Sequence, residues 1–191
     1  MKINEIFYSI QGEGANVGIP MVFVRLSGCN LSCIYCDTEF ESGSEMTTDQ
    51  ILKEIENYPC QWILWTGGEP MQQLTAEIVE KFSAAGYKQA IETNGSRPIP
   101  FELDWVTVSP KVAEHVLASN FPQGVDELRY PWHAQKRSLP SPKVSATHLF
   151  LSPINDGDAL NRENLAACIS TVKACPQFRL SCQMQKTWVI R

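Results

Sequence analysis

Short apolar runs alternate along the chain with segments whose apolar side chains recur at helical spacing. The run at residues 22–26 is rich in β-branched side chains and is broken by Ser27 and Gly28, which is typical of a buried strand. Comparable runs predict further strands at residues 61–66, 89–92, 105–108, 127–130, 147–151 and 178–181.

Helical segments lie between several of these strands. The sequence Thr47–Gln50 has the form of a capping box, and apolar residues follow it at helical spacing. A second apolar stripe at residues 74–82 predicts a helix that Gly86 closes with a left-handed cap. A last helix is predicted over residues 162–174.

Repeated strand–helix units imply a parallel sheet with right-handed crossovers. A complete eight-unit barrel takes about 250 residues, whereas this chain has 191. We therefore predict an α/β fold in the form of an abbreviated, partly open (β/α) barrel, with residues 1–191 as a single domain. Residues 131–145 contain three prolines and several basic side chains, Arg137 among them, and predict an irregular loop or lid.

Composition narrows the choice of partners. The net charge of −5 and the pI of about 5.2 argue against a nucleic-acid-binding surface, which would need a basic face. No apolar run approaches the roughly 18 residues of a membrane span, and Glu5 lies where a signal peptide would be apolar. These features predict a cytoplasmic protein, in which the seven cysteines would be reduced.

Three cysteines, Cys29, Cys33 and Cys36, follow the strand predicted at residues 22–26. The carboxyl ends of strands are where open α/β sheets and barrels place their chemistry. Three thiolates would hold a four-iron cluster at three corners and leave one iron open to a ligand. The alternatives are a zinc site, which would normally need a second group of Cys or His ligands, and buried structural cysteines.

The spacing Cys-x3-Cys-x2-Cys, with Tyr35 before the last cysteine, resembles that of the radical S-adenosylmethionine (SAM) superfamily. The resemblance implies a barrel of the radical SAM type and a [4Fe-4S] cluster whose open iron binds SAM and cleaves it to an adenosyl radical. It also implies that Gly68 and Glu69 receive the amino end of SAM. Two later strand ends, for which plain turns are the alternative, contribute the expected SAM contacts Ser109, Pro110, Lys111, Ser152, Pro153, Ile154 and Asn155.

A narrower resemblance covers nearly the whole chain, and it is to the 7-carboxy-7-deazaguanine synthase family. The segments that carry it are residues 7–14, 23–31, 35–38, 66–70, 92–95 and 109–111. The resemblance implies a radical ring contraction of 6-carboxy-5,6,7,8-tetrahydropterin to 7-carboxy-7-deazaguanine, with loss of ammonia, on the route to queuosine and other 7-deazapurines. SAM is regenerated in that reaction and acts as a cofactor.

The substrate of that reaction has a hydrogen-bonding pterin edge and a carboxylate. Gln11 and Glu13 can serve the edge with their side chains, and Ile10 and Gly12 with backbone groups. Arg25 is a charge inside an apolar strand and must be paired. Its guanidinium suits the substrate carboxylate, and an ion pair with an acidic residue of the protein is the alternative.

Three further assignments come from the resemblance alone. Thr66 helps to hold the substrate, and Arg191 contacts it through its backbone. Thr38, which follows Asp37 after the cysteine loop, contacts a magnesium ion that also binds the substrate carboxylate. Magnesium often takes few protein ligands, and a helix cap is the alternative role for Thr38.

The chain departs from the family pattern at two places. Gln185 stands where we expect a histidine, and Ser152 stands where many relatives carry a glutamine before the proline. The rival functions are a glycyl-radical activating enzyme and a non-catalytic iron–sulfur or zinc module. The expected partners are the pterin, a one-electron donor such as a flavodoxin, and a second copy of the chain in a homodimer, with no direct contact to nucleic acid or membrane.

Overall fold

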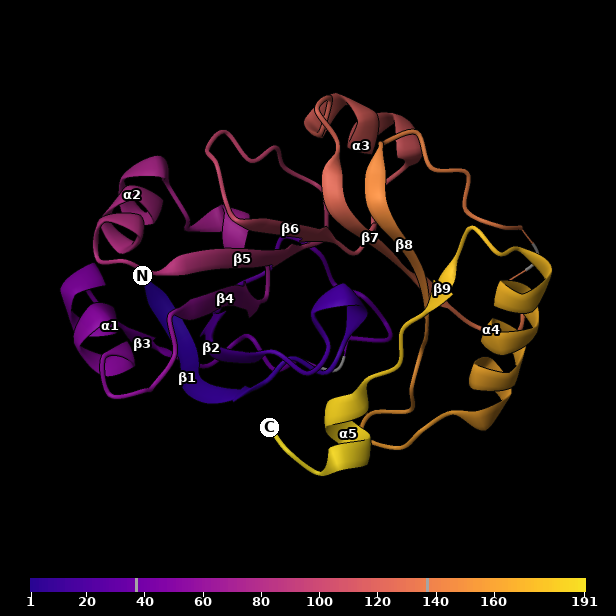
Figure 1. Cartoon of the computed structure of the whole chain (residues 1–191), viewed down its shortest axis with the longest axis horizontal. Helices are drawn as coiled ribbons and strands as arrows, with labels where there is room; N and C mark the ends of the chain where they lie inside the picture. The colour runs from indigo at the N-terminus through magenta and orange to yellow at the C-terminus, as the bar shows by residue number, and fades with distance from the viewer. Residues whose placement is uncertain (37, 137) are drawn as a thin grey trace.

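The computed structural model describes residues 1–36, 38–136 and 138–191, and these fold around a single mixed sheet (Figure 1). The strands, in chain order, are β1 (Lys2–Ile10), β2 (Pro20–Leu26), β3 (Ser44–Glu45), β4 (Trp62–Gly67), β5 (Lys88–Thr93), β6 (Trp105–Val108), β7 (Val125–Trp132), β8 (Ala146–Pro153) and β9 (Arg179–Leu180). Their order across the sheet is β3-β1-β2-β4-β5-β6-β7-β8-β9. Neighbours from β2 to β9 are parallel, whereas β1 runs antiparallel to both β2 and β3.

Helices cover the outer side of the curved sheet. They are α1 (Thr48–Ile55), α2 (Ala76–Ala84), α3 (Glu114–Asn120), α4 (Arg162–Ala174) and α5 (Met184–Trp188), with short 3-10 turns η1 (Gly14–Asn16) and η2 (Pro70–Gln72). In Figure 1, α1 to α4 lie around the outside of the sheet, while α5 lies in the gap between β1 and β9. Within the described residues β9 pairs only with β8, so the sheet stays open at this gap.

The local sequence explains where the helices begin and end. Thr47 forms the predicted capping box, because its hydroxyl accepts from the Gln50 amide at 3.2 Å while the Gln50 side chain accepts from the Thr47 amide at 2.7 Å. Gly86 has a φ of +88° after α2, as its predicted left-handed cap requires. Asn161 caps α4, which covers the residues expected of the last helix.

Side chains along the strands alternate between two environments. On β2, Val22 and Val24 face outward into a buried core that also contains Ile51 of α1 and Phe82 of α2. Met21 faces the concave side, in a smaller apolar layer that closes the bottom of the barrel. Polar residues nearer the carboxyl ends of the strands, such as Thr66, Glu92 and Thr107, continue this concave face and line a pocket.

The structure confirms the predicted partly open barrel and each strand predicted from residue 22 onward. The expectation of a wholly parallel sheet is wrong at one edge, where β1 and β3 are antiparallel. The strand–helix alternation is also incomplete, since residues 94–104 and 133–145 connect strands without a helix in the part of the chain that is described. The second of these connections is the predicted irregular loop, of which Arg137 lies outside the described residues. No described helix has both the length and the apolar character that crossing a bilayer requires.

Candidate active site

A pocket of about 230 Å³ opens at the carboxyl ends of the parallel strands. The register of the strands brings the lining residues to the same level. Glu92 on β5 pairs with Thr107 on β6, and Pro131 on β7 pairs with Ser152 on β8. The predicted site residues that line this pocket are Glu13, Cys29, Cys33, Cys36, Thr38, Thr66, Gly68, Ser109, Lys111, Ser152, Pro153, Ile154 and Asn155. Segments far apart in the sequence therefore meet in one space at the end of the barrel where such folds place their chemistry.

The cysteine loop is held from two sides. At its base, the Gly28 amide donates to the Phe40 carbonyl at 2.7 Å, which closes the loop. From the end of β5, the Asn94 side-chain amide donates to Asn30 Oδ1 at 3.1 Å and lies 4.0 Å from Cys29 Sγ. These contacts keep the loop against the pocket.

The donor set of the loop fits an iron–sulfur cluster, because three thiols border one pocket and thiolates are the usual ligands of such clusters. Burial raises the pKa of Cys33, the Lys111 ammonium opposes that shift, and the nearby Cys36 and Cys29 thiols add to it. Among the described residues, no three His, Cys, Asp or Glu side chains converge on a point where a single metal ion could sit.

Lys111 lies in the pocket between the end of β6 and the cysteine loop. Its ammonium donates to Ser109 Oγ at 2.7 Å and lies 5.8 Å from the centre of the Tyr35 ring. Burial lowers the pKa of Lys111, and the negative potential of Cys33 opposes this shift. The predicted serine and lysine contacts therefore lie side by side and present a cation beside the thiols.

The loop after β4 approaches the cysteine loop at backbone distance. A Cβ on Gly68 would lie 1.8 Å from the Gly28 carbonyl oxygen, so only glycine fits there. The same carbonyl accepts from the Glu69 amide at 2.9 Å. The two loops are thus joined directly, with no side chain between them.

The Glu69 side chain is fully buried and turned away from the pocket wall. Its carboxylate accepts from the Thr93 hydroxyl at 2.7 Å and from the amides of Asn94 and Met71 at 2.8 and 3.0 Å. In this structure Glu69 ties the loop after β4 to the end of β5. Its contact with the amino group of SAM stays a prediction.

Arg129 on β7 is the centre of a buried charge cluster. Its side chain is 6% exposed, and its guanidinium donates to Glu13 at 2.5 Å, Glu92 at 2.6 Å and Glu127 at 2.9 Å. Glu92 also accepts from the Gln11 amide at 3.1 Å. Burial favours the neutral form of Glu92, but the Arg129 charge and these hydrogen bonds outweigh it and lower the pKa. One cation shared by three carboxylates leaves the cluster negative.

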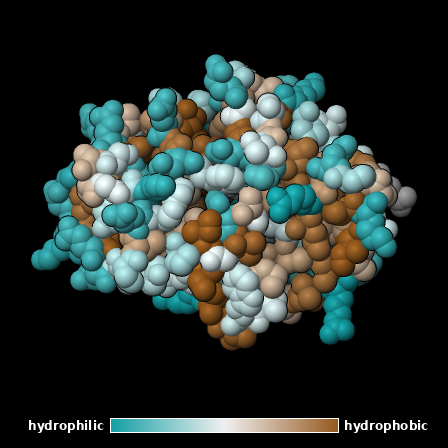
Figure 2. Space-filling view, in the orientation of Figure 1, coloured by the Kyte–Doolittle hydropathy of each residue, from teal (hydrophilic) through white to brown (hydrophobic). Residues whose placement is uncertain are grey.

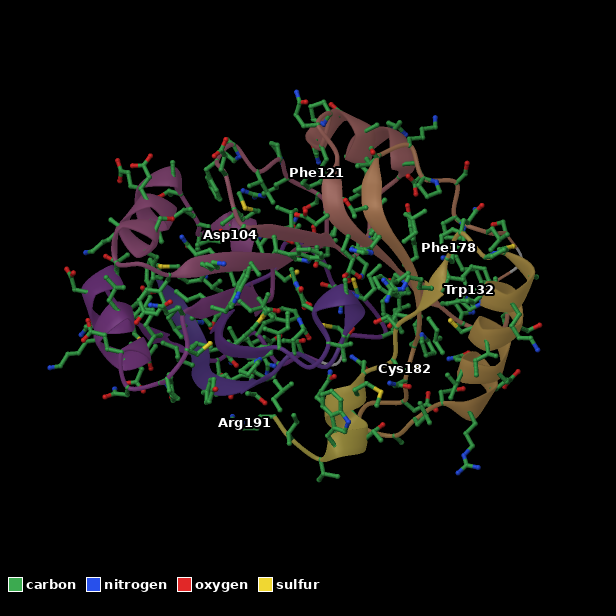
Figure 3. All side chains as sticks on the ribbon, viewed as in Figure 1. Asp104, Phe121, Trp132, Phe178, Cys182 and Arg191 are labelled. Atoms are coloured by element: carbon green, nitrogen blue, oxygen red, sulfur yellow. The ribbon has the colours of Figure 1, made fainter. Side chains whose placement is uncertain are left out.

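Arg25 faces the barrel interior from β2 and pairs with Glu5 at 2.5 Å. Arg191 pairs with the other oxygen of Glu5, and both guanidinium groups lie over the Phe7 ring, 5.4 Å from its centre for Arg25 and 5.1 Å for Arg191. Figure 3 shows Arg191 beside β1, where its carbonyl accepts from Ser9 Oγ at 2.5 Å. The ion pair within the protein that was the alternative for Arg25 is therefore present. Substrate contacts of Arg25 and Arg191 stay predictions.

Several other predicted residues are not part of the pocket lining. Those that the wall does not include are Ile10, Gln11, Gly12, Arg25, Glu69, Pro110 and Arg191. Gln11 is buried, and its Oε1 accepts from the Glu13 amide at 3.0 Å. Gly12 lies against Gln185, whose side-chain oxygen is buried without a hydrogen-bond partner in the described part of the chain. Gln11 thus supports the pocket residue Glu13 from outside the cavity.

Comparisons with known proteins agree with this arrangement. Residues 23–115 match the radical SAM superfamily. Over 190 residues the chain is 40% identical to a 7-carboxy-7-deazaguanine synthase of Bacteroides thetaiotaomicron, and the match covers 100% of this chain and 98% of the relative. The chain belongs to the 7-carboxy-7-deazaguanine synthase family.

Two further family comparisons support the assignment. The 7-carboxy-7-deazaguanine synthase of Haemophilus influenzae is 35% identical over 193 residues, with 97% of this chain and 92% of that protein covered. The crystal structure of QueE from Escherichia coli matches with a TM-score of 0.71 at 25% identity, and covers 95% of this chain and 93% of the other.

Several residues of the pocket lining were given no binding role by the sequence, among them Glu92, Thr107, Arg129 and Gln183. Arg129 lies inside a strand where a charge every second residue, as in Glu127 and Arg129, is typical of a solvent-facing edge. The intervening Leu128 and the following Tyr130 are buried on the outer side, which indicates that the charged face points inward. Gln183 also lines the pocket, from the segment in which Gln185 departs from the family pattern.

Proposed function

We propose that this protein is an enzyme that converts 6-carboxy-5,6,7,8-tetrahydropterin into 7-carboxy-7-deazaguanine with release of ammonia. The reaction is a radical SAM ring contraction in queuosine and 7-deazapurine biosynthesis. Similarity over the full chain to 7-carboxy-7-deazaguanine synthases supports it. The structural observation that carries it is that the cysteine loop, the predicted SAM segments and the Arg129 cluster border the same pocket.

The protein uses a [4Fe-4S] cluster and SAM, as its place in the radical SAM superfamily implies. When bound, these groups supply the radical that removes hydrogen from the pterin. Cys29, Cys33 and Cys36 would hold the cluster, the Gly68 backbone would receive the amino end of SAM, and Lys111 would bind its carboxylate.

The Arg129 cluster would orient the pterin edge. Glu13 and Glu92 line the pocket, and Arg129 holds both of them, so they act as fixed acceptors for N–H groups of the substrate. Within the described residues Arg25 uses only Nη1, on Glu5, so its other donors would serve the substrate carboxylate. The Thr66 hydroxyl lies 3.5 Å from Glu92 and completes this side of the pocket.

A magnesium ion would bind at Thr38, which lines the pocket beside the cysteine loop. The preceding residue, Asp37, lies outside the described residues. One hydroxyl with substrate oxygens and waters would complete an octahedral oxygen shell. Thr38→Ala should raise the magnesium concentration needed for half-maximal activity, whereas Thr38→Ser should stay close to wild type. Equal magnesium dependence in both variants would remove this assignment.

A homodimer would cover the apolar surface around the C-terminal segment. Trp188, Val189 and Ile190 are exposed there, as are Tyr8 and Ile10 on β1. Figure 2 shows apolar surface gathered in the lower middle of this view, where Figure 1 places the C-terminus. A second copy of the chain would remove this surface from water.

The remaining partners follow from the chemistry. A one-electron donor such as a flavodoxin must reduce the cluster, and it would act in the cytoplasm. The cysteine loop offers it a route, because Cys36 and Ile34 are exposed. Residues 1–191 would work as one domain, since the pocket takes its walls from segments along most of the chain.

Anaerobic reconstitution tests the function. The protein is loaded with iron and sulfide and then given SAM, magnesium, a reductant and the carboxypterin. We expect 7-carboxy-7-deazaguanine and ammonia in equal amounts, with SAM undiminished. Cluster-loaded protein that binds SAM but forms no deazaguanine would overturn the proposed reaction. Protein that takes up zinc and no iron would overturn the radical chemistry as well.

A further inference from the structure

Gln183 joins two predicted binding regions that come from distant parts of the chain. It lies between β9 and α5, next to the Cys182 labelled in Figure 3, and its side chain lines the pocket. Its Oε1 accepts from Asn155 Nδ2 at 2.8 Å, and its Nε2 donates to Glu13 Oε1 at 3.1 Å. One amide therefore contacts the predicted SAM loop at one end and the predicted pterin site at the other.

The hydrogen bonds from Asn155 to Gln183 and from Gln183 to Glu13 form a relay, and the partners at its two ends fix which way each side-chain amide faces. Glu13 is held by the Arg129 guanidinium and, as a carboxylate, can only accept, so the Gln183 amide must turn its N–H₂ toward it. The Gln183 oxygen then faces Asn155, which must present its own N–H₂. Asn155 does so because its Oδ1 accepts from the Asn161 amide at 3.3 Å.

We propose that Gln183 is a positioning residue that couples the binding of SAM to the binding of the carboxypterin. The inference rests on the proposed function. SAM against residues 152–155 would fix Asn155, an ordered Asn155 would fix the Gln183 amide, and that amide would hold Glu13 ready for the pterin. Binding of the first ligand then orders side chains that the second ligand would otherwise have to order. The second ligand loses less conformational entropy on binding, so the two ligands bind cooperatively in either order.

Gln185 supplies a matched control from the same segment. Its Nε2 also donates to Glu13 Oε1, at 3.2 Å, but its side chain does not line the pocket. Its Oε1 has no hydrogen-bond partner in the described structure, so no bond links it to Asn155. Gln185→Met would remove one hydrogen bond from Glu13 but keep the bonds that join Asn155, Gln183 and Glu13, whereas Gln183→Met would remove both of those bonds.

Equilibrium binding tests the coupling without turnover. Cluster-loaded protein is kept unreduced, and the Kd for SAM is measured with and without saturating 6-carboxytetrahydropterin. We expect SAM to bind about fivefold more tightly when the pterin is present, and the pterin to gain the same factor from SAM. Gln183→Met should reduce this factor to about one, while Gln185→Met should weaken pterin binding and retain the factor.

A second variant separates coupling from folding. Gln183→Glu keeps an acceptor for Asn155 but places a carboxylate against Glu13, so SAM alone should bind as in wild type while the coupling is lost. The inference is overturned if wild type shows no coupling, or if both Gln183 variants retain it. Protein that carries its cluster yet binds neither SAM nor pterin would instead overturn the proposed function, and the inference with it.

Discussion

The carbonyl oxygen of Gly28 occupies the space in which Gly68 would carry a side chain. A Cβ on Gly68 would lie 1.8 Å from that oxygen, and the next amide, that of Glu69, donates to it at 2.9 Å. The loop after β4 and the start of the cysteine loop are therefore fastened backbone to backbone. The position of the first cysteine, Cys29, depends on the absence of one methyl group.

Gly68→Ala should displace the cysteine loop and reduce the iron that the protein retains. The new methyl group meets backbone on a rigid loop, so the loops must separate and lose their hydrogen bond. Iron and sulfide content after anaerobic gel filtration measures the effect. Gly86→Ala is the control, because its φ of +88° brings strain of about 1–2 kcal/mol but no atom lies near its Cβ. Wild-type iron content in Gly68→Ala would contradict the prediction.

Arg129→Gln should lower the free energy of unfolding by about 3–5 kcal/mol, because it leaves the buried Glu127 and the partly buried Glu13 and Glu92 without their cation. Pterin binding should also weaken, since Glu13 and Glu92 would lose their fixed orientation. Denaturant unfolding and equilibrium pterin binding measure the two effects. The exposed Arg162, at the start of α4, supplies the control Arg162→Gln, which should stay within about 0.5 kcal/mol of wild type. Equal stability of the two variants would show that Arg129 does not balance the cluster.

Glu69→Gln should weaken SAM binding through the loop that it supports. An amide can accept at only one end, so one backbone N–H that now donates to Glu69 would lose its acceptor, at a cost of about 1–3 kcal/mol. The Kd for SAM and the thermal midpoint measure the change. Glu80→Gln, on the exposed side of α2, should alter neither. A weaker SAM complex at unchanged stability would instead support the predicted direct contact of Glu69 with SAM.

Cys168 should make the folded state less stable at alkaline pH. Burial, together with the nearby Cys182, raises its pKa from 9.0 to about 12. Between these values the unfolded chain releases the thiol proton first, so stability falls as pH rises, by up to about 1.4 kcal/mol per pH unit. Cys168→Ala should flatten the dependence of unfolding free energy on pH in this window. An unchanged slope in Cys168→Ala would contradict the prediction.

The sequence predicts most of the fold because the outer face of the barrel follows regular patterns of apolar residues and helix caps. Val22, Val24 and the capping box at Thr47 reflect local geometry and burial against one apolar core. β1 escapes prediction because Asn4, Glu5 and Ser9 interrupt its apolar pattern, and it becomes a strand by pairing with β2 and β3. Such pairing depends on residues distant in sequence and leaves no local signal.

Some residues of the site also have a local sequence signal, whereas others depend on partners distant in the sequence. Cys29, Gly68 and Lys111 follow strand ends, and strand ends can be recognised from the chain alone. Arg129 and Gln183 cannot be recognised in that way, because their roles arise from partners on other elements. Gln183 precedes α5, a helix of five residues with no side-chain cap, which depends on tertiary contacts to form.

Among the described residues, no backbone hydrogen bonds join β1 to β9, and this gap affects how a ligand can enter the barrel. Because β9 does not pair with β1 in the described structure, the segment around α5 is held across the gap by individual contacts, such as that of the Met184 amide with the Gly12 carbonyl at 3.0 Å. Loosening these contacts would admit a guest molecule without unzipping any part of the sheet. The C-terminal segment thus closes the barrel through contacts that are independent of the pairing between strands.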